Sequence, residues 1–180
     1  MAVRPIVLFP DPVLRLRCRP VERFDAALVE LVNDLIETCH AAPGLGLAAP
    51  QIGVDLRVAV VDTSVGAAPT ALHVLVNPQV VERNGEQADS EGCLSIPDLT
   101  ERIERSERVL VRALDANGLP VEIAGEGLLA RALCHEIDHL DGVLFVDYLR
   151  GLRRELMLRR LRRTFGEFSP ADVPRAALPF

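Results

Sequence analysis

The stretch LLARALCHEIDHLDG, residues 128–142, constrains the fold of this chain more than any other segment. Its apolar residues fall on almost every side of the helix that their spacing predicts, which indicates a helix buried inside the domain. Two histidines, His135 and His139, lie one turn apart on the same face, and Glu136 directly follows the first. On a buried helix, H-E-x-x-H predicts two metal ligands and a base that acts on water bound to the ion.

Two imidazoles do not hold a catalytic metal, so the sequence should supply a third ligand. Phe145 stands where the long metal-protease pattern needs its third histidine, which excludes that class. Glu155 is available as a carboxylate ligand of the thermolysin kind, but it lies in an arginine-rich segment. A pair of core histidines satisfied by hydrogen bonds is the alternative to a metal site.

Two cysteines are the other candidates for the third ligand. Cys93 lies in EGCLSIP, among residues that favour turns and close backbone approach, and is accessible enough there to bind a metal. Cys134 adjoins His135 and therefore points about 100° away from it around the helix, which indicates a packing role. The residues alone leave open that Cys93 is a small buried hydrophobe.

The segment GLGLAAPQIG, residues 44–53, is also unusual. It mimics a dinucleotide-binding fingerprint, but that motif must follow a strand and open a helix, whereas here a helix precedes it and Pro50 follows. Gly44 and Gly46 instead let the backbone approach a ligand closely, and Gln51 offers a neutral amide donor suited to an oxyanion hole. A tight loop with Gln51 on the surface is the alternative.

The pattern of apolar residues predicts helices over residues 24–40, 126–141 and 150–165, and strands over 57–62 and 71–81. Asn117-Gly118 between two alternating runs predicts a β-hairpin. Because the strands cluster between long helices, we expect an α+β fold with antiparallel β-sheets packed around the buried central helix, and a C-terminal helix. Residues 1–165 should form a single catalytic metal-dependent domain, and the Pro- and Ala-rich residues 166–180 a loosely ordered tail.

Composition narrows the class of protein. With 180 residues, 49% of them hydrophobic, the chain can form one domain with a substantial core. Its net charge of −6 argues against broad nucleic-acid binding, so no DNA partner is expected. Charges and prolines interrupt the first 20 residues early, so we expect neither a signal peptide nor a membrane span. Four cysteines in such a chain indicate free thiols or ligands, and the cytoplasm is the expected compartment.

Taken together, GLGLAAPQ, EGCLS and HEIDH resemble the three motifs of the peptide deformylase family, in the same order and at similar separations. The resemblance covers nearly the whole chain up to about residue 165. One departure is Cys134, where the family often has glutamine, and it affects only local packing because the position is not a ligand. The resemblance implies a metal-dependent hydrolase that removes the formyl group from the N-terminal formyl-methionine of newly synthesised proteins and releases formate.

The resemblance also implies which residues do the chemistry. Cys93, His135 and His139 would be the metal ligands, and the fourth position would be left for water. Fe(2+) is the usual ion of the family, and Zn(2+), Ni(2+) or Co(2+) can replace it. Glu136 would take the proton of the water, and the oxyanion would be held by the metal, the Gln51 amide and the Leu94 backbone N–H.

Substrate contacts follow from the same resemblance. The formylated peptide would add like a strand beside Gly44, Leu45 and Gly46 on one side and Gly92 on the other. Glu91 belongs to this set and is a candidate for orienting a metal ligand. The side chains expected to help line the methionine pocket share the helix of His135; they are Leu128, Arg131 and Ala132.

Two other functions use the same residues. A metallopeptidase could employ the same three ligands and cleave internal peptide bonds. A non-catalytic metal-binding module is the second rival, but a structural site needs no base, and Glu136 therefore argues against it.

Residues 150–165, RGLRRELMLRRLRRTF, concentrate arginine in an acidic protein. Leu149, Leu152, Leu156 and Phe145 form a stripe that is expected to dock this helix, with the arginines facing outward. A solvated charged face is the simpler interpretation. The density of arginine and the family's association of this helix with the ribosome favour docking on ribosomal RNA.

Overall fold

The computed structural model describes residues 2–42, 44–68 and 71–176. The fold is α+β, as predicted, and all its strand pairings within the two sheets are antiparallel. One sheet has the order β1-β2-β3-β6-β7 and the other pairs β4 with β5. The strands are β1 Gly46–Ala48, β2 Val58–Asp62, β3 Leu72–Asn84, β4 Gln87–Cys93, β5 Ile96–Arg105, β6 Arg108–Leu114 and β7 Pro120–Glu126.

Helices cover both faces of the larger sheet around β2. Alternate side chains of a strand point to opposite faces, so Val58 and Val60 pack with α1 (Ala26–Ala41) while Ala59 and Val61 pack with α2 (Leu128–Leu140). Asp25 caps the start of α1, where its side chain accepts hydrogen bonds from the backbone N–H groups of residues 27 and 28. Both helices were predicted from their periodicity, with ends shifted by one or two residues.

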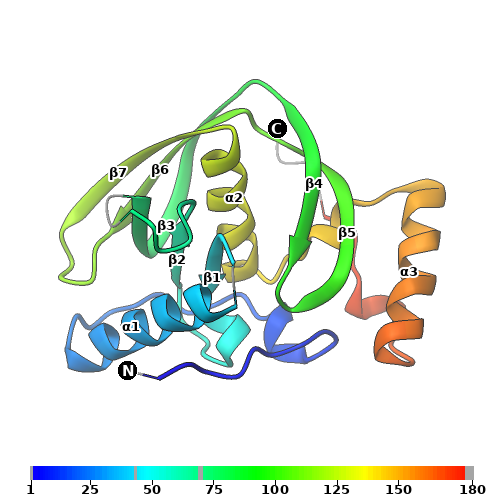
Figure 1. Cartoon of the computed structure of the whole chain (residues 1–180), viewed down its shortest axis with the longest axis horizontal. Helices are drawn as coiled ribbons and strands as arrows, with labels where there is room; N and C mark the ends of the chain where they lie inside the picture. Colours follow the sequence, from blue (N-terminus) through cyan, green and yellow to red (C-terminus); the bar gives the residue numbers. More distant parts are fainter. Residues whose placement is uncertain (1, 43, 69–70, 177–180) are drawn as a thin grey trace.

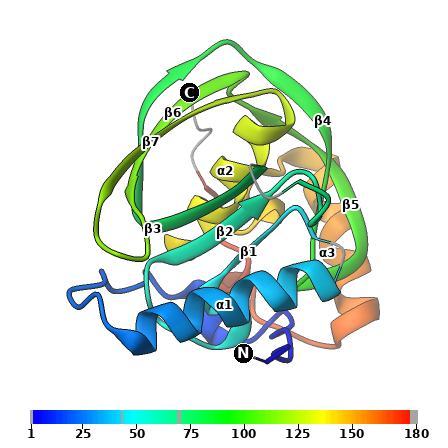
Figure 2. The same cartoon turned by 60° about the vertical axis from the view of Figure 1, so that its left-hand side comes forward.

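The helix α2 lies between the five-stranded sheet and the β4–β5 ribbon, near the middle of the molecule (Figure 1). Figure 2 shows α1 on the opposite side of the sheet from α2. Most of α2 is buried, but its first residue, Leu128, is exposed. The central helix expected to carry H-E-x-x-H is therefore present, and one of its ends opens to solvent.

Turns divide the strands between the two sheets. The predicted hairpin joins β6 to β7: Asp115 N–H donates to Leu119 O at 2.9 Å, and Gly118 has a φ of 83°, which favours glycine. Gly85, with a φ of 65°, follows β3 and lets the chain leave the large sheet for β4. The β4–β5 ribbon and β1 were not among the strands predicted from sequence.

The helix α3 (Gly151–Phe165) lies at one end of the molecule beside β5 (Figure 1). It docks through Met157 and Leu161, which are buried together with residues of β5 and of the short helix η4 (Phe145–Tyr148). Leu152 and Leu156 are 69% and 45% exposed, so the docking stripe expected from the sequence is wrong in these two residues. Both stripes have helical spacing, and only tertiary packing decides between them.

Residues 166–176, within the segment expected to form a loosely ordered tail, fold back on the domain. Val173 is buried beside η4 and α3, and Ala176 N–H donates to Asp147 O at 3.1 Å. Residues 177–180 of that expected tail lie outside the described residues. Among the described helices, none is both long and apolar enough to cross a bilayer.

Candidate active site

Three side chains of the kinds that can bind a metal meet where β4 ends against α2. His139 Nε2 lies 3.2 Å from both His135 Nε2 and Cys93 Sγ, and the three donor atoms all lie within 4.8 Å of one another. The pairing of β4 with β5 shifts register between Gly92 and Cys93. Such an irregularity re-aims the side chain that follows it, and here that side chain is the thiol beside the two imidazoles.

This donor set fits a divalent transition-metal ion. A thiolate and two imidazoles suit such ions, and three protein donors leave a position for water or substrate. Ligands about 2.0–2.3 Å from a tetrahedral ion lie about 3.3–3.7 Å apart, close to the 3.2 Å that separates His139 Nε2 from each of the other two donor atoms. In the part of the chain that the structure describes, these three residues form the one cluster able to share an ion.

Cys134 lies outside this cluster. Its side chain is buried among the core residues between α2 and the large sheet, 3.5 Å from Arg83 Nη1. Burial raises the pKa of its thiol, which disfavours the thiolate form that binds metals. The position of Cys134 agrees with the packing role expected from its place on the helix.

Glu136 is buried on α2, and its Oε2 has no hydrogen-bond partner among the described residues. Burial raises the pKa of this carboxyl group to about 7. The strand β1 passes directly against the carboxylate at Gly46. A carboxyl group with a pKa near neutrality is suited to accept a proton and later return it.

Gln51 is buried in the short helix η2 (Ala49–Ile52) and does not lie on the surface of a loop. Its Oε1 accepts a hydrogen bond from the Ala48 N–H at 2.9 Å. Its Nε2 lies 3.5 Å from Cys93 Sγ and 3.3 Å from Ser95 Oγ. Because the amide oxygen is engaged by the backbone, the amide nitrogen is the end that faces the Cys93 thiol.

A pocket of about 440 Å³ adjoins these groups. Its lining contains each predicted catalytic and substrate-binding residue and two of the three predicted metal ligands; the third, His139, is buried and is not part of the lining. The predicted residues in the lining are Gly44, Leu45, Gly46, Gln51, Glu91, Gly92, Cys93, Leu94, Leu128, Arg131, Ala132, His135 and Glu136. Residues 96–100 of β5 also line it, and the sequence analysis did not anticipate them.

Glu91 holds the outer side of His135. Its Oε1 lies 2.7 Å from His135 Nδ1, and its Oε2 accepts a hydrogen bond from Arg131 Nη1 at 2.9 Å. Burial raises the pKa of Glu91, but the hydrogen bond with His135 and the charge of Arg105 outweigh it and hold the pKa well below its usual range. An ionised Glu91 favours the proton of His135 on Nδ1, which leaves Nε2 free to bind a metal.

His139 has a different environment. Burial, with His135 beside it, lowers the pKa of His139 well below its ordinary value. Its Nδ1 has no hydrogen-bond partner among the described residues. A neutral imidazole is the form that binds a metal, so burial itself favours the ligand state of His139.

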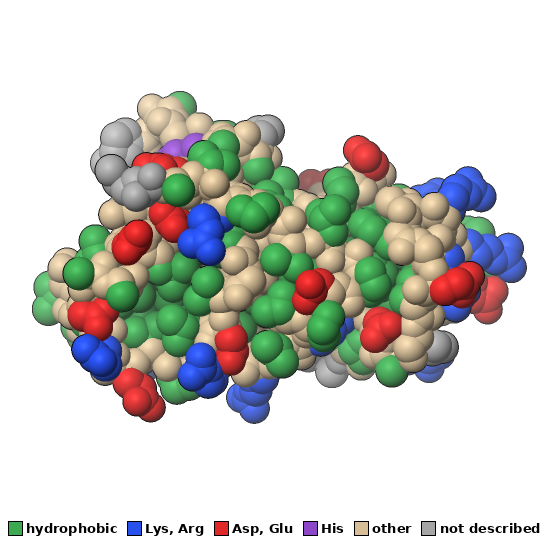
Figure 3. Space-filling model, turned by 90° about the horizontal axis from the view of Figure 1, so that it is seen from below, with side chains coloured by type: hydrophobic (Ala, Val, Ile, Leu, Met, Phe, Trp, Pro, Cys, Tyr) green, Lys and Arg blue, Asp and Glu red, His purple; other side chains and the backbone are tan. Residues whose placement is uncertain are grey.

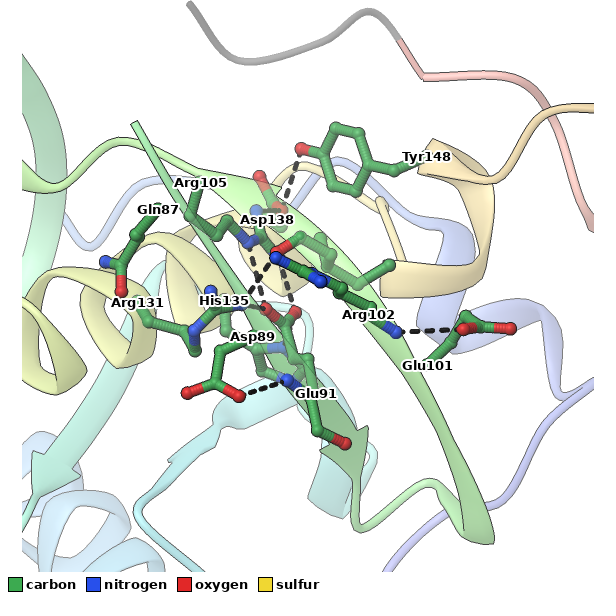
Figure 4. A network of polar contacts seen from close by, with 12 residues as sticks. Gln87, Asp89, Glu91, Glu101, Arg102, Arg105, Arg131, His135, Asp138 and Tyr148 are labelled. Carbon is green, nitrogen blue, oxygen red and sulfur yellow. Dashed lines mark hydrogen bonds and ion pairs between the residues drawn. The ribbon is translucent and has the colours of Figure 1, made fainter. Parts of the chain in front are cut away.

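Three residues close to the site were missed by sequence analysis. Arg105, at the end of β5, joins Glu91 to Asp138, and Asp138 accepts a hydrogen bond from the Tyr148 hydroxyl (Figure 4). Asp138 lies inside HEIDH and could have been singled out by that position. Arg105 and Tyr148 carry no local sequence signal that distinguishes them from surface residues.

Comparisons with known proteins agree on one family. The family model for polypeptide deformylase matches residues 3–155. The chain is 49% identical over 163 residues to the peptide deformylase of Acidobacterium capsulatum, covering 91% of this chain and 96% of that protein. It is 51% identical over 147 residues to the peptide deformylase of Heliobacterium modesticaldum, covering 82% of this chain and 94% of that one.

Solved structures give the same result. The fold matches the crystal structure of a peptide deformylase from Legionella pneumophila with a TM-score of 0.85 and 48% sequence identity, covering 91% of this chain and 95% of that one. A peptide deformylase from Ehrlichia chaffeensis in complex with actinonin matches with a TM-score of 0.82 and 37% identity, covering 93% of this chain and 100% of that chain.

Proposed function

The chain belongs to the polypeptide deformylase family, whose members remove the N-terminal formyl group from nascent proteins, and we propose that Cys93, His135 and His139 are its metal ligands. The family is metal-dependent, and these side chains offer three donor atoms within 4.8 Å of one another. That convergence beside the buried Glu136 carboxylate is the observation that carries the proposal.

The proposed ion is Fe(2+), on the grounds of family resemblance. One thiolate and two imidazoles also suit Zn(2+), Ni(2+) and Co(2+), so the ligand set does not choose among them. Metal analysis of protein purified without oxygen tests this assignment. Iron at one equivalent per chain, lost on exposure to air together with activity, is expected; stoichiometric zinc in fully active anaerobic protein would overturn it.

Glu136 and the donors around it perform the proposed proton and charge transfers. When bound, the metal ion would supply Lewis acidity and lower the pKa of a water molecule. Glu136 accepts the proton of that water and passes it to the departing amine of methionine. Gln51 Nε2 and the Leu94 backbone N–H donate hydrogen bonds to the charge that develops on the formyl oxygen.

The peptide substrate is proposed to bind between β1 and β4. In the described residues β1 pairs only with β2 and β4 only with β5, so each strand has a further edge. Leu45 and Gly46 on one side and Gly92 on the other line the pocket, and an extended peptide can hydrogen-bond to such edges. Leu128, Arg131 and Ala132, on the α2 face of the pocket, are proposed to help line the space for the methionine side chain.

A formate-release assay tests the proposed specificity. Formyl-methionyl peptides should release formate in proportion to enzyme and time, while the same peptides without the formyl group stay intact. Internal peptide bonds should also remain intact, because family membership favours deformylation over the metallopeptidase alternative. Internal cleavage by the purified protein would overturn the proposal.

The arginines of α3 are proposed to dock the enzyme on ribosomal RNA, where nascent chains emerge in the cytoplasm. Six of the seven arginines of residues 150–165 are exposed, and Arg154 is half-buried. Figure 3 shows basic side chains gathered at the end of the molecule that carries α3. Leu152 and Leu156 are exposed beside them and add apolar surface to this face.

Co-sedimentation with ribosomes at rising salt tests this docking. Replacing Arg159, Arg160, Arg162 and Arg163 with glutamine should abolish sedimentation, and binding by the wild type should weaken with salt as counterions are released. A control with Arg17, Arg19, Arg23 and Arg112 replaced by glutamine has the same change in charge and should sediment normally. Equal sedimentation of both variants at low salt would mean that the arginines of α3 form a solvated charged face and do not dock the enzyme.

We also propose that residues 1–165 act as one catalytic domain. The family model matches residues 3–155. The active site draws on β1, β4 and α2, which are far apart in the chain, so only the folded domain brings its residues together.

A further inference from the structure

A fully buried arginine lies at the junction of the two elements that carry the proposed metal ligands. Arg105, the last residue of β5, is 0% exposed. Its Nε and Nη2 donate to the two carboxylate oxygens of Glu91 at 3.1 and 2.6 Å, and its Nη1 donates to Asp138 Oδ2 at 2.5 Å. One guanidinium group therefore engages a carboxylate of β4 and a carboxylate of α2 (Figure 4).

Both carboxylates lie within two residues of a proposed metal ligand in the chain. Glu91 is two residues before Cys93, and its Oε1 also contacts His135 Nδ1 at 2.7 Å. Asp138 directly precedes His139 on α2. Because Arg105 engages both, it fixes the separation between β4 and α2 at the level of the three donor atoms.

The remaining contacts hold the guanidinium group and its partners in place. Tyr148, in η4, donates its hydroxyl to Asp138 Oδ2 at 2.8 Å, and its ring lies 4.8 Å from the guanidinium carbon of Arg105. Arg131 Nη1 donates to Glu91 Oε2 at 2.9 Å. Two guanidinium groups thus face two carboxylates.

Stability alone is a poor explanation for this arrangement. Desolvating several charges is costly, and a buried ion pair often stabilises a fold no more than apolar residues of similar volume. A planar guanidinium group offers something that apolar packing does not, since it fixes the direction of two carboxylates at once. Groups that orient metal ligands from outside typically change metal affinity about 10–100-fold when they are removed.

We propose that Arg105 is a positioning residue for the metal centre. By bridging Glu91 and Asp138 it holds Cys93 at the two imidazoles and keeps His135 turned with Nε2 toward the ion. Tyr148 supports it by fixing the direction of Asp138. This inference rests on the proposed ligand set, and its test therefore includes a readout of metal binding apart from turnover.

The experiment measures Co(II) binding by chelator competition and by absorption spectroscopy. Arg105→Gln should bind Co(II) about 10–100-fold more weakly than the wild type, with altered ligand-field bands. Arg105→Lys should recover only part of the affinity, because an ammonium group cannot form the bidentate contact with Glu91. Tyr148→Phe should shift the same bands by a smaller amount.

The matched control is Arg15→Gln, which breaks another largely buried arginine–carboxylate pair. Arg15 donates to both oxygens of Asp147 at 2.6 and 3.1 Å, in a cluster with η4 and residue 172. This variant should lower the melting temperature but keep the Co(II) affinity and spectrum of the wild type.

The outcomes separate the two proposals. Wild-type affinity and spectrum in both Arg105→Gln and Tyr148→Phe would overturn the positioning role, as would an equal loss of affinity in Arg15→Gln. If Arg105→Gln does not fold, the spectrum of Tyr148→Phe decides, and an unchanged spectrum overturns the role. The Co(II) spectrum of the wild type should also contain bands that are lost in Cys93→Ala. If no band differs between these two proteins, the proposed metal site is overturned instead.

Discussion

Gly46 approaches Glu136 so closely that a β-carbon at position 46 would lie 2.6 Å from Glu136 Oε1. Real β-carbons essentially never come so near another heavy atom, so a side chain here must displace the carboxylate. The glycine of β1 is therefore required by the position of the proposed base, and not by its own backbone torsion angles.

Gly46→Ala should consequently lose most of its turnover while it keeps its metal. The added methyl group pushes Glu136 away from the water it is proposed to deprotonate, and misplacement of a catalytic group by about 1 Å can cost on the order of 10²-fold. Formate release and metal content should be measured on the same preparation.

Leu47→Ala is the control for this substitution, since Leu47 belongs to the same strand but packs in the core with α1. It should destabilise the fold by about 2–5 kcal/mol and keep kcat close to the wild-type value. Full activity in Gly46→Ala would show that Glu136 tolerates displacement and would remove it from the proposed role.

Cys93 and Cys134 should behave oppositely when replaced by alanine. Cys93→Ala removes a proposed ligand and should empty the site, whereas Cys134→Ala removes a buried packing group 3.5 Å from Arg83 and should keep full occupancy. Elemental analysis of both purified variants decides the matter. Loss of the ion from Cys134→Ala alone would contradict the ligand assignment.

Gln51 should contribute through its amide nitrogen. Removing one oxyanion donor costs on the order of 10²–10³-fold in kcat. The kcat of Gln51→Ala should therefore be lower than that of the wild type by this factor, while the variant retains its metal. Gln51→Glu keeps an acceptor for the Ala48 N–H but has no amide donor, and it should lose a similar factor. If Gln51→Glu is as active as the wild type, the donor is not needed.

Asp62 should make stability depend on pH in the acid range. Burial raises its pKa, but hydrogen bonds from Ser64, His40 and the Gly66 N–H outweigh it and lower the pKa to about 2. A carboxylate whose pKa is lowered on folding stabilises the protein fully above its unfolded pKa of about 3.9. That stabilisation is lost as the pH falls through the folded pKa.

The comparison between the wild type and Asp62→Asn isolates this effect. The difference in their free energies of unfolding should be largest near pH 5 and shrink between about pH 4 and pH 2. Denaturant unfolding at several pH values measures it. A difference that stays constant over this range would mean that the Asp62 carboxylate has an ordinary pKa in the folded protein.

Sequence patterns predicted the helices better than they predicted the site's surroundings. The periodicity of α1 and α2 and the Asn117-Gly118 turn were sufficient because each depends on local spacing. The β4–β5 ribbon was not predicted because most of its residues are polar or charged and, in the described residues, each of its strands pairs with only one other strand. Burial there comes from α2, α3 and η4, which lie far away in the sequence.

Arg105 illustrates the limit in physical terms. It ends a strand that also contains Arg102 and Glu104, and nothing in the sequence shows that only Arg105 is buried with carboxylates. Leu156 and Met157 are neighbours on α3, and only the placement of the helix makes Met157 the buried one. Both outcomes depend on long-range packing, which local spacing does not encode.

The central claim is that Glu136 transfers the proton while Cys93, His135 and His139 bind the ion. Measuring metal content, melting temperature and formate release on one preparation of Glu136→Gln tests it most directly. Full metal occupancy and a folded protein with nearly all turnover lost are expected, because an amide cannot accept the proton of water. Formate release at the wild-type rate by this variant would contradict the account.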